Sequence, residues 1–121
     1  MIEVVKEFPD DVVGFTAKGR VTRKDYLDTV IPAVEGALKR HPKMRLYYEL
    51  GPQFESIDLG ADWEDFKLGV EHYSGWERVA VVTDVGWIRH VVGAFRFVMP
   101  GEMRIFSNTQ VPEARGWIAA H

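Results

Sequence analysis

Few side chains in this sequence have the type and spacing needed for covalent chemistry. It contains no cysteine, which excludes a thiolate nucleophile, a disulfide and a Cys-ligated metal site. No serine stands in a Gly-x-Ser-x-Gly elbow, and no two histidines are spaced as in His-Glu-x-x-His. No P-loop or Gly-x-Gly-x-x-Gly pattern occurs either. We therefore predict that the protein is not an enzyme and has no catalytic residue, metal site or cofactor.

The segment that carries most information is a helix predicted over residues 84–99. At 100° per residue, Arg89 and Arg96 share one line, Gly86 and Gly93 lie beside it, and most of the remaining circumference is apolar. A helix that covers a sheet needs an apolar stripe of only somewhat over 100°. The surplus fits close packing within the fold, a homodimer face, or a ligand or membrane surface. The two glycines suggest a close approach by a neighbouring group.

Composition and charge exclude several classes of protein. Hydrophobic residues make up 46% and charged residues 27%, which excludes a disordered chain. The net charge of −3 and the scattered arginines exclude a nucleic-acid footprint. No apolar run reaches the roughly 18–20 residues of a bilayer span, and the first residues lack a signal-peptide core. From a length of 121 residues we expect a single domain over 1–121, in the cytoplasm.

Strand and helix patterns alternate along most of the chain. We predict strands over 3–8, 12–18, 44–50, 78–83 and 103–106, and helices over 23–40, 63–73, 84–99 and 112–120. Thr22 is the expected N-cap of the first helix, and Pro32 predicts a kink near Asp28. Gly51-Pro52 should end a strand, followed by a loop over 53–60. This order, ββαβαβαβα, predicts an α/β fold with a mixed, mostly parallel five-stranded sheet, an antiparallel hairpin at its edge and helical cover.

Aromatic and aliphatic side chains follow two of the predicted strands. Open α/β sheets bind ligands at the carboxyl ends of their parallel strands. If the two strands are neighbours, the side chains can converge on one apolar pocket; the alternative is that they are ordinary core residues. With two further residues of the 84–99 helix, the candidate ligand-binding set is Phe54, Trp63, Phe66, Trp87, Ile88, Val91 and Phe95.

Short segments spread over nearly the whole chain resemble one family in their order and spacing. They are Val12-Val13-Gly14-Phe15, Asp25-Tyr26, Arg45-Leu46-Tyr47-Tyr48-Glu49-Leu50, Ala80-Val81-Val82-Thr83-Asp84 with Trp87-Ile88, and Pro100-Gly101-Glu102-Met103-Arg104-Ile105-Phe106. They resemble the SpoIIAA-like proteins, relatives of the STAS domain of anti-sigma-factor antagonists. The resemblance implies the SpoIIAA/STAS-like fold of a sheet flanked by helices. It also implies action without catalysis, by docking to a kinase or channel under the control of serine phosphorylation.

The phosphorylated turn of true antagonists, an Asp-Ser-Ser-Gly-like sequence after a central strand, is missing here. Ser56 stands near the corresponding place and is the candidate phosphosite. The resemblance to the SpoIIAA-like branch instead implies a small apolar ligand or a membrane surface.

Two functions follow as hypotheses. The first is a non-enzymatic binding module for a small apolar or lipid-like ligand at a membrane surface, in which Arg89 and Arg96 contact an anionic headgroup. The second is a STAS-type switch that docks to a protein partner through the 84–99 helix and residues 54–56. A homodimer is compatible with both.

Overall fold

The computed structural model describes residues 1–58, 76–95 and 101–120. Within these ranges, five strands form one sheet in the spatial order β1-β2-β3-β4-β5. They are β1 (Ile2–Val5), β2 (Val12–Thr22), β3 (Met44–Asp58), β4 (Trp76–Val82) and β5 (Glu102–Phe106). β1 is antiparallel to β2, and every other neighbouring pair is parallel. The predicted fold class, a mostly parallel α/β sheet with an antiparallel hairpin at its edge, is confirmed.

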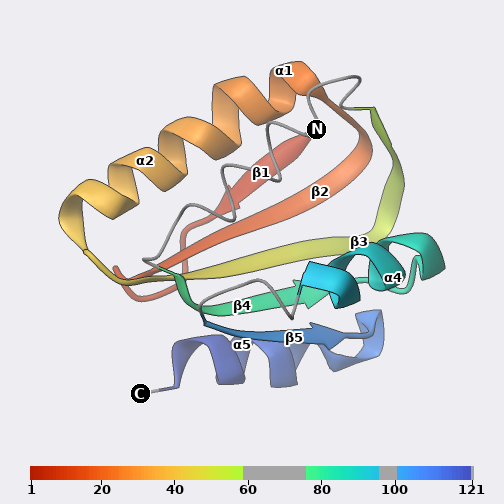
Figure 1. Cartoon of the computed structure of the whole chain (residues 1–121). Helices are drawn as coiled ribbons and strands as arrows, with labels where there is room; N and C mark the ends of the chain where they lie inside the picture. The colour runs from red at the N-terminus through yellow and green to blue at the C-terminus, as the bar shows by residue number, and fades with distance from the viewer. Residues whose placement is uncertain (59–75, 96–100, 121) are drawn as a thin grey trace.

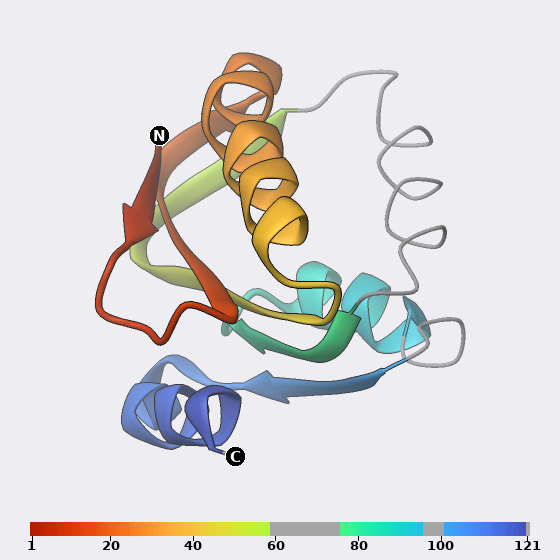
Figure 2. The same cartoon turned by 90° about the vertical axis from the view of Figure 1, so that its left-hand side faces the viewer.

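Helices cover both faces of this sheet. One continuous helical run consists of α1 (Arg23–Asp25), the π-helical turn η1 (Tyr26–Val30) and α2 (Ile31–Arg40); further along lie α4 (Gly86–Phe95), η3 (Asn108–Gln110) and α5 (Val111–Ala119). α2 and α4 contribute side chains to the apolar cluster on one face of the sheet, and α5 to the cluster on the other. Figures 1 and 2 show α2 and α5 on opposite sides of the strands.

The first helical run begins where the sequence predicts, and its hydrogen-bond pattern is irregular near the position of the predicted kink. Thr22 is the N-cap: its hydroxyl accepts the Asp25 N–H at 3.3 Å, and the Asp25 carboxylate accepts the Thr22 N–H at 3.0 Å. The irregularity expected near Asp28 is the π-helical turn η1. Pro32 has no N–H to donate to the Asp28 carbonyl, so the helix widens by one residue at this point.

The predicted ends of two strands were wrong, because β2 and β3 continue well beyond 18 and 50. Gly51-Pro52 does not end β3. Ala17 pairs with Leu50 and Gly19 pairs with Phe54, so β3 has two more residues than β2 between these pairs. The extra residues form a bulge that contains Pro52. Gly19 has a φ of +59°, which only glycine adopts without strain. Residues 53–58, predicted as a loop, are therefore strand. The helix predicted over 63–73 lies outside the described residues.

The alternation of side chains along the strands divides the core in two. Val13, Phe15 and Ala17 of β2 point to the face that α2 covers. On the opposite face, Tyr47 of β3 packs with α5. The first strand is shorter than predicted: β1 ends at Val5, and Phe8 leaves the sheet to pack against the Tyr47 ring at 5.0 Å.

Candidate functional site

The described part of α4 has one exposed side and one buried side. Ile88 is 5% exposed and belongs to the core, whereas the next residue toward the N-terminus, Trp87, is 54% exposed. Gly86, His90 and Ala94 are exposed as well, and at 100° per residue they fall on the same arc as Trp87. We call this arc the open face of α4. None of its four residues is Lys, Arg, Asp or Glu, so a large indole stands on an arc whose one titratable side chain is His90.

Arg89, a predicted headgroup ligand, makes a contact inside the molecule. Its Nη1 donates to the Thr83 carbonyl at 2.9 Å. Thr83 is itself fully buried, and its hydroxyl accepts the Val85 N–H at 3.1 Å. These bonds fix the turn between β4 and α4, so part of the Arg89 guanidinium is committed to the backbone. Arg96 lies outside the described residues.

Only part of the predicted apolar pocket falls on described side chains. Phe54 and Ile88 share one apolar cluster, which Val85 and Val92 also join. Trp87 points to the surface instead. Trp63 and Phe66 lie outside the described residues, and so do the side chains of Val91 and Phe95. The structure thus places Ile88 in the core, Phe54 against the same apolar cluster, and Trp87 at the surface.

The glycines of α4 do not mark a close contact with any described group. No described atom lies within 4 Å of a Cβ built at Gly86 or Gly93. The described groups therefore make no close approach at these glycines, and an approach by a headgroup stays a prediction.

Ser56 does not lie in the predicted loop. It is an exposed residue of β3 whose register partner is Arg20 of β2. The expected loop context was wrong because β3 passes through Gly51-Pro52. Phosphorylation of Ser56 stays a prediction.

Sequence reasoning missed a pair of arginines that hold α5 to the sheet. Arg45 is only 4% exposed, and its Nη1 donates to the Ile118 carbonyl at 3.0 Å and also to that of Ala120. Arg78, its register partner on β4, donates to the carbonyls of Trp117 at 3.0 Å and Ala120 at 3.2 Å. The last carbonyls of a helix lack intrahelical partners and carry partial negative charge, so two guanidinium groups satisfy them together.

The arginine pair also affects a carboxylate at the edge of this cluster. Arg45 Nη2 donates to Glu77 Oε1 at 2.7 Å. This hydrogen bond holds the pKa of Glu77 below its ordinary value of 4.5. The Arg45 charge is therefore neutralised at one end of the guanidinium by a carboxylate and at the other by the end of α5.

A third arginine ties α5 to the opposite end of the same face. Arg115 pairs with Glu7 at 3.1 Å and lies 3.8 Å from Glu49, which accepts the Tyr47 hydroxyl hydrogen bond. Burial raises the pKa of Tyr47, so the phenol keeps its proton. Period-two alternation in Met44–Leu50 places Arg45, Tyr47 and Glu49 on one face; that signal could have identified this polar cluster in the sequence.

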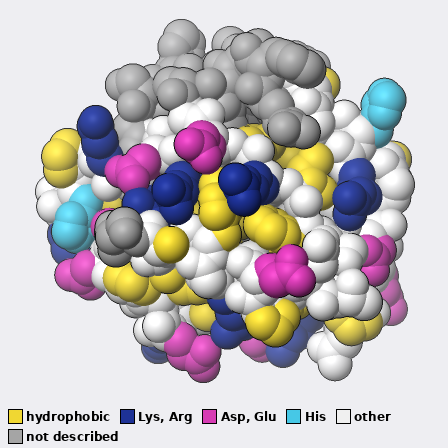
Figure 3. All heavy atoms as spheres, turned by 90° about the horizontal axis from the view of Figure 1, so that it is seen from below, with side chains coloured by type: hydrophobic (Ala, Val, Ile, Leu, Met, Phe, Trp, Pro, Cys, Tyr) yellow, Lys and Arg dark blue, Asp and Glu magenta, His cyan; other side chains and the backbone are white. Residues whose placement is uncertain are grey.

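Aromatic rings add a further layer to the α5 surface. The guanidinium carbons of Arg104 and Arg78 lie 4.9 and 5.2 Å from the centre of the Trp117 ring, within cation–π range. Seen from this side, basic side chains lie among hydrophobic ones (Figure 3). Across the described ranges, no group of three or more His, Asp or Glu side chains is arranged to hold a metal ion. In the same ranges, no helix has the length and hydropathy to cross a bilayer.

The fold and these faces define a class of protein: a mixed α/β sheet that opens with an antiparallel hairpin and alternates with helices on both sides. A model of the SpoIIAA-like family matches residues 12–119. Because the match spans nearly the whole chain, the protein belongs to the SpoIIAA-like family, and the resemblance stated from the sequence is confirmed.

A solved structure agrees with this assignment. It is an uncharacterised protein of the DUF3478 family with a SpoIIAA-like fold from Shewanella loihica PV-4. The two chains are 26% identical and superpose with a TM-score of 0.72, over 97% of this chain and 93% of that one. A comparison with curated proteins finds no match.

Proposed function

We propose that this protein is a non-catalytic docking module that binds a protein partner through the open face of α4. The observation that carries the proposal is the contrast between Trp87, 54% exposed, and Ile88, 5% exposed, at consecutive positions of one helix. Tryptophan is among the side chains most enriched at the energetic centres of protein interfaces. A groove that takes up the indole and faces Gly86, His90 and Ala94 would meet no Lys, Arg, Asp or Glu side chain on this arc.

The position of α4 supports this role. The helix starts at the carboxyl end of β4, the side of a parallel sheet on which binding surfaces usually form. Ile88 anchors it in the core, and Arg89 ties it to the Thr83 carbonyl at 2.9 Å. The indole therefore stands on a positioned helix, and little conformational entropy is lost when a partner binds it. Loss of a Trp of this kind costs about 2 kcal/mol or more of binding free energy.

A second candidate is the binding of a small apolar or lipid-like ligand at a membrane surface. It is favoured by the residue next to Trp87 in the sequence. Ile88 belongs to an apolar cluster against which Phe54 and Val92 also pack. Tryptophan is also typical of the interface between water and lipid. Arg89 and Arg96 as headgroup ligands, and Ser56 as a phosphosite, belong to these proposals.

Site-specific photo-crosslinking tests the docking surface. A photoreactive residue at position 87 is compared in cells with one at position 27, because Leu27 in η1 is 49% exposed and offers a matched apolar position elsewhere. The proposal expects one discrete protein adduct, identified by mass spectrometry, from position 87 and not from position 27. Equal labelling at the two positions would contradict it.

Native mass spectrometry separates the second candidate from the first. A bound mass of a few hundred daltons that disappears after solvent extraction, and that Trp87→Ala removes, would support the lipid-like ligand. A clean apoprotein would contradict that ligand and leave docking in place.

A further inference from the structure

At the outer edge of β5, some backbone groups have no partner among the described residues. β5 is the last strand in the sheet order, so among the described strands it pairs only with β4. The Phe106 carbonyl accepts the Thr83 N–H at 2.9 Å and therefore points toward β4. Because backbone polar groups alternate in direction along a strand, Met103 and Ile105 direct theirs away from β4. A row of unpaired groups of this kind is a template for another strand.

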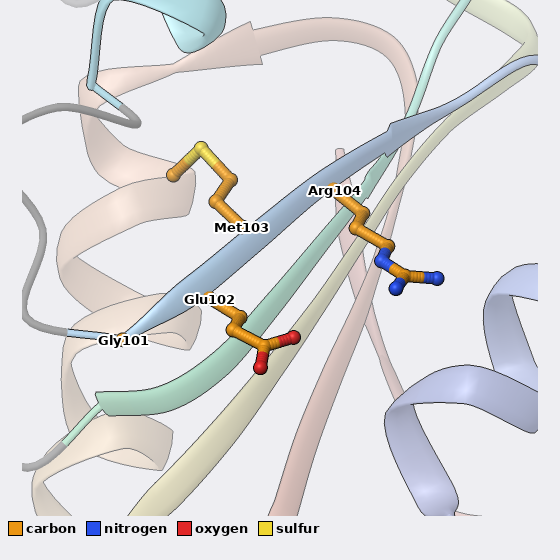
Figure 4. A pocket seen from close by; sticks show the side chains of 4 residues that line it. All are labelled: Gly101, Glu102, Met103 and Arg104. Carbon is orange, nitrogen blue, oxygen red and sulfur yellow. The ribbon is translucent and has the colours of Figure 1, made fainter.

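Two charged side chains on this strand have no ion-pair partner among the described residues. Glu102 and Arg104 are both exposed. They leave β5 on the same side, toward α5, while Met103 leaves it on the other (Figure 4). Together with Gly101, these three residues line a shallow pocket of about 270 Å³. Arg104 is positioned by its contact with the Trp117 ring, 4.9 Å away.

The opposite edge of the sheet is different. β1 has only four residues, and its Glu3 is paired with Lys18 of the neighbouring β2 at 3.1 Å. The charges at that edge are thus neutralised within the chain. At the β5 edge, Glu102 and Arg104 are two residues apart. Each would face a side chain of opposite charge if the same sequence paired with it in the antiparallel direction.

We propose that β5 pairs antiparallel with β5 of a second copy of this chain, about a two-fold axis at Met103. In this register Glu102 faces the partner's Arg104, and Arg104 faces the partner's Glu102. Gly101 faces the partner's Ile105. Directly opposed side chains in an antiparallel pair have Cβ atoms about 5 Å apart, close enough for both ion pairs to form.

Backbone direction and charge select this register together. Met103 points its N–H and C=O outward, so the two Met103 residues can exchange both hydrogen bonds across the axis. A two-fold axis at Arg104 would place the two Arg104 side chains opposite each other, and like charges in that position are destabilising. The interface is self-complementary, as a two-fold dimer requires.

Charge reversal in the full-length protein tests the register. Glu102→Arg places two arginines against the partner's two arginines, and Arg104→Glu does the same with carboxylates. We expect light scattering with size-exclusion chromatography to find a dimer for the natural chain and monomers for each single variant. Mixing the two variants in equal amounts should restore a dimer, because every cross-strand pair then joins opposite charges.

Two further measurements complete the test. Met103→Pro removes an N–H that points away from β4, so it should abolish the dimer while the circular dichroism spectrum stays unchanged. Added salt should weaken the natural dimer. A natural chain that stays monomeric at high concentration would overturn the proposal. So would variants that fail to dimerise when mixed although both are folded.

Discussion

α4 and α5 follow neighbouring parallel strands, yet they are attached to the sheet in different ways. α5 buries Ala114 and Ile118 completely, and its last carbonyls accept hydrogen bonds from Arg45 and Arg78. Among its described side chains, α4 buries Ile88, and Arg89 reaches back to the turn before the helix. α5 is thus attached to the sheet along its buried side and at its C-terminal end, whereas α4 has an open face with an exposed tryptophan and no Lys, Arg, Asp or Glu.

The contrast separates the surface of α5, which stabilises the fold, from the open face of α4, which is available to bind a partner. Side chains that are fully buried or donate to otherwise unpaired carbonyls contribute to the free energy of unfolding. A large apolar side chain left more than half exposed contributes little to it. We therefore expect substitutions in the α5 attachment to destabilise the fold and substitutions on the open face of α4 to affect binding alone.

The largest effect is expected at Ile118. Replacing this fully buried side chain with alanine removes apolar contacts and leaves a cavity against the sheet. Ile118→Ala should lower the free energy of unfolding by about 3 kcal/mol, as measured by urea denaturation. A loss below about 1 kcal/mol would mean that α5 is not the anchored helix that we describe.

A somewhat smaller effect is expected from the arginine pair. Arg45→Met keeps most of the side-chain volume but leaves the carbonyls of Ile118 and Ala120 with one donor fewer. The free energy of unfolding should fall by about 2 kcal/mol. Arg104→Met, measured at protein concentrations at which the chain is a monomer, is the matched control. Arg104 is exposed, and within one chain its described contact is with the Trp117 ring. Its loss should therefore cost about 0.5–1 kcal/mol. Equal losses for the two variants would contradict the role of Arg45.

The pH dependence of the free energy of unfolding tests the hydrogen bond between Arg45 and Glu77. The pKa of Glu77 is lowered in the folded state by the hydrogen bond from Arg45, relative to an ordinary value of 4.5. The carboxylate therefore stabilises the fold above pH 4.5, and this contribution is lost as the pH falls through the lowered pKa. The difference in unfolding free energy between the natural chain and Glu77→Gln should shrink over that acidic range. A difference that does not change with pH would contradict the pairing.

Much of the fold could be predicted because local signals agree with the global arrangement. The order of the elements can be predicted without knowing any tertiary contact. The signals are the capping residue Thr22, the apolar run of β4 and the alternation of strand and helix patterns. The continuation of β3 past Gly51-Pro52 could not be predicted, because it depends on pairing with β2 residues more than thirty positions earlier. Proline ends a strand in isolation, but here a bulge opposite Gly19 accommodates it.

The candidate site was predicted less completely than the fold. The helical pattern identifies α4 as apolar over much of its circumference, but it cannot tell which side faces the core. Ile88 and Trp87 look equivalent in sequence, and tertiary packing alone separates them. The Arg45 bonds to the end of α5 span more than seventy residues, so no local pattern gives their partners.

The most direct test of the account uses one variant and two readouts. Trp87→Ala should keep the free energy of unfolding within about 0.5 kcal/mol of the natural chain, as expected for an exposed side chain. The same purified variant should lose the protein partner that photo-crosslinking identifies at position 87, while Leu27→Ala keeps it. A Trp87→Ala protein that is strongly destabilised, or that is stable and still binds the partner with natural affinity, would contradict the assignment of the open face of α4 to recognition.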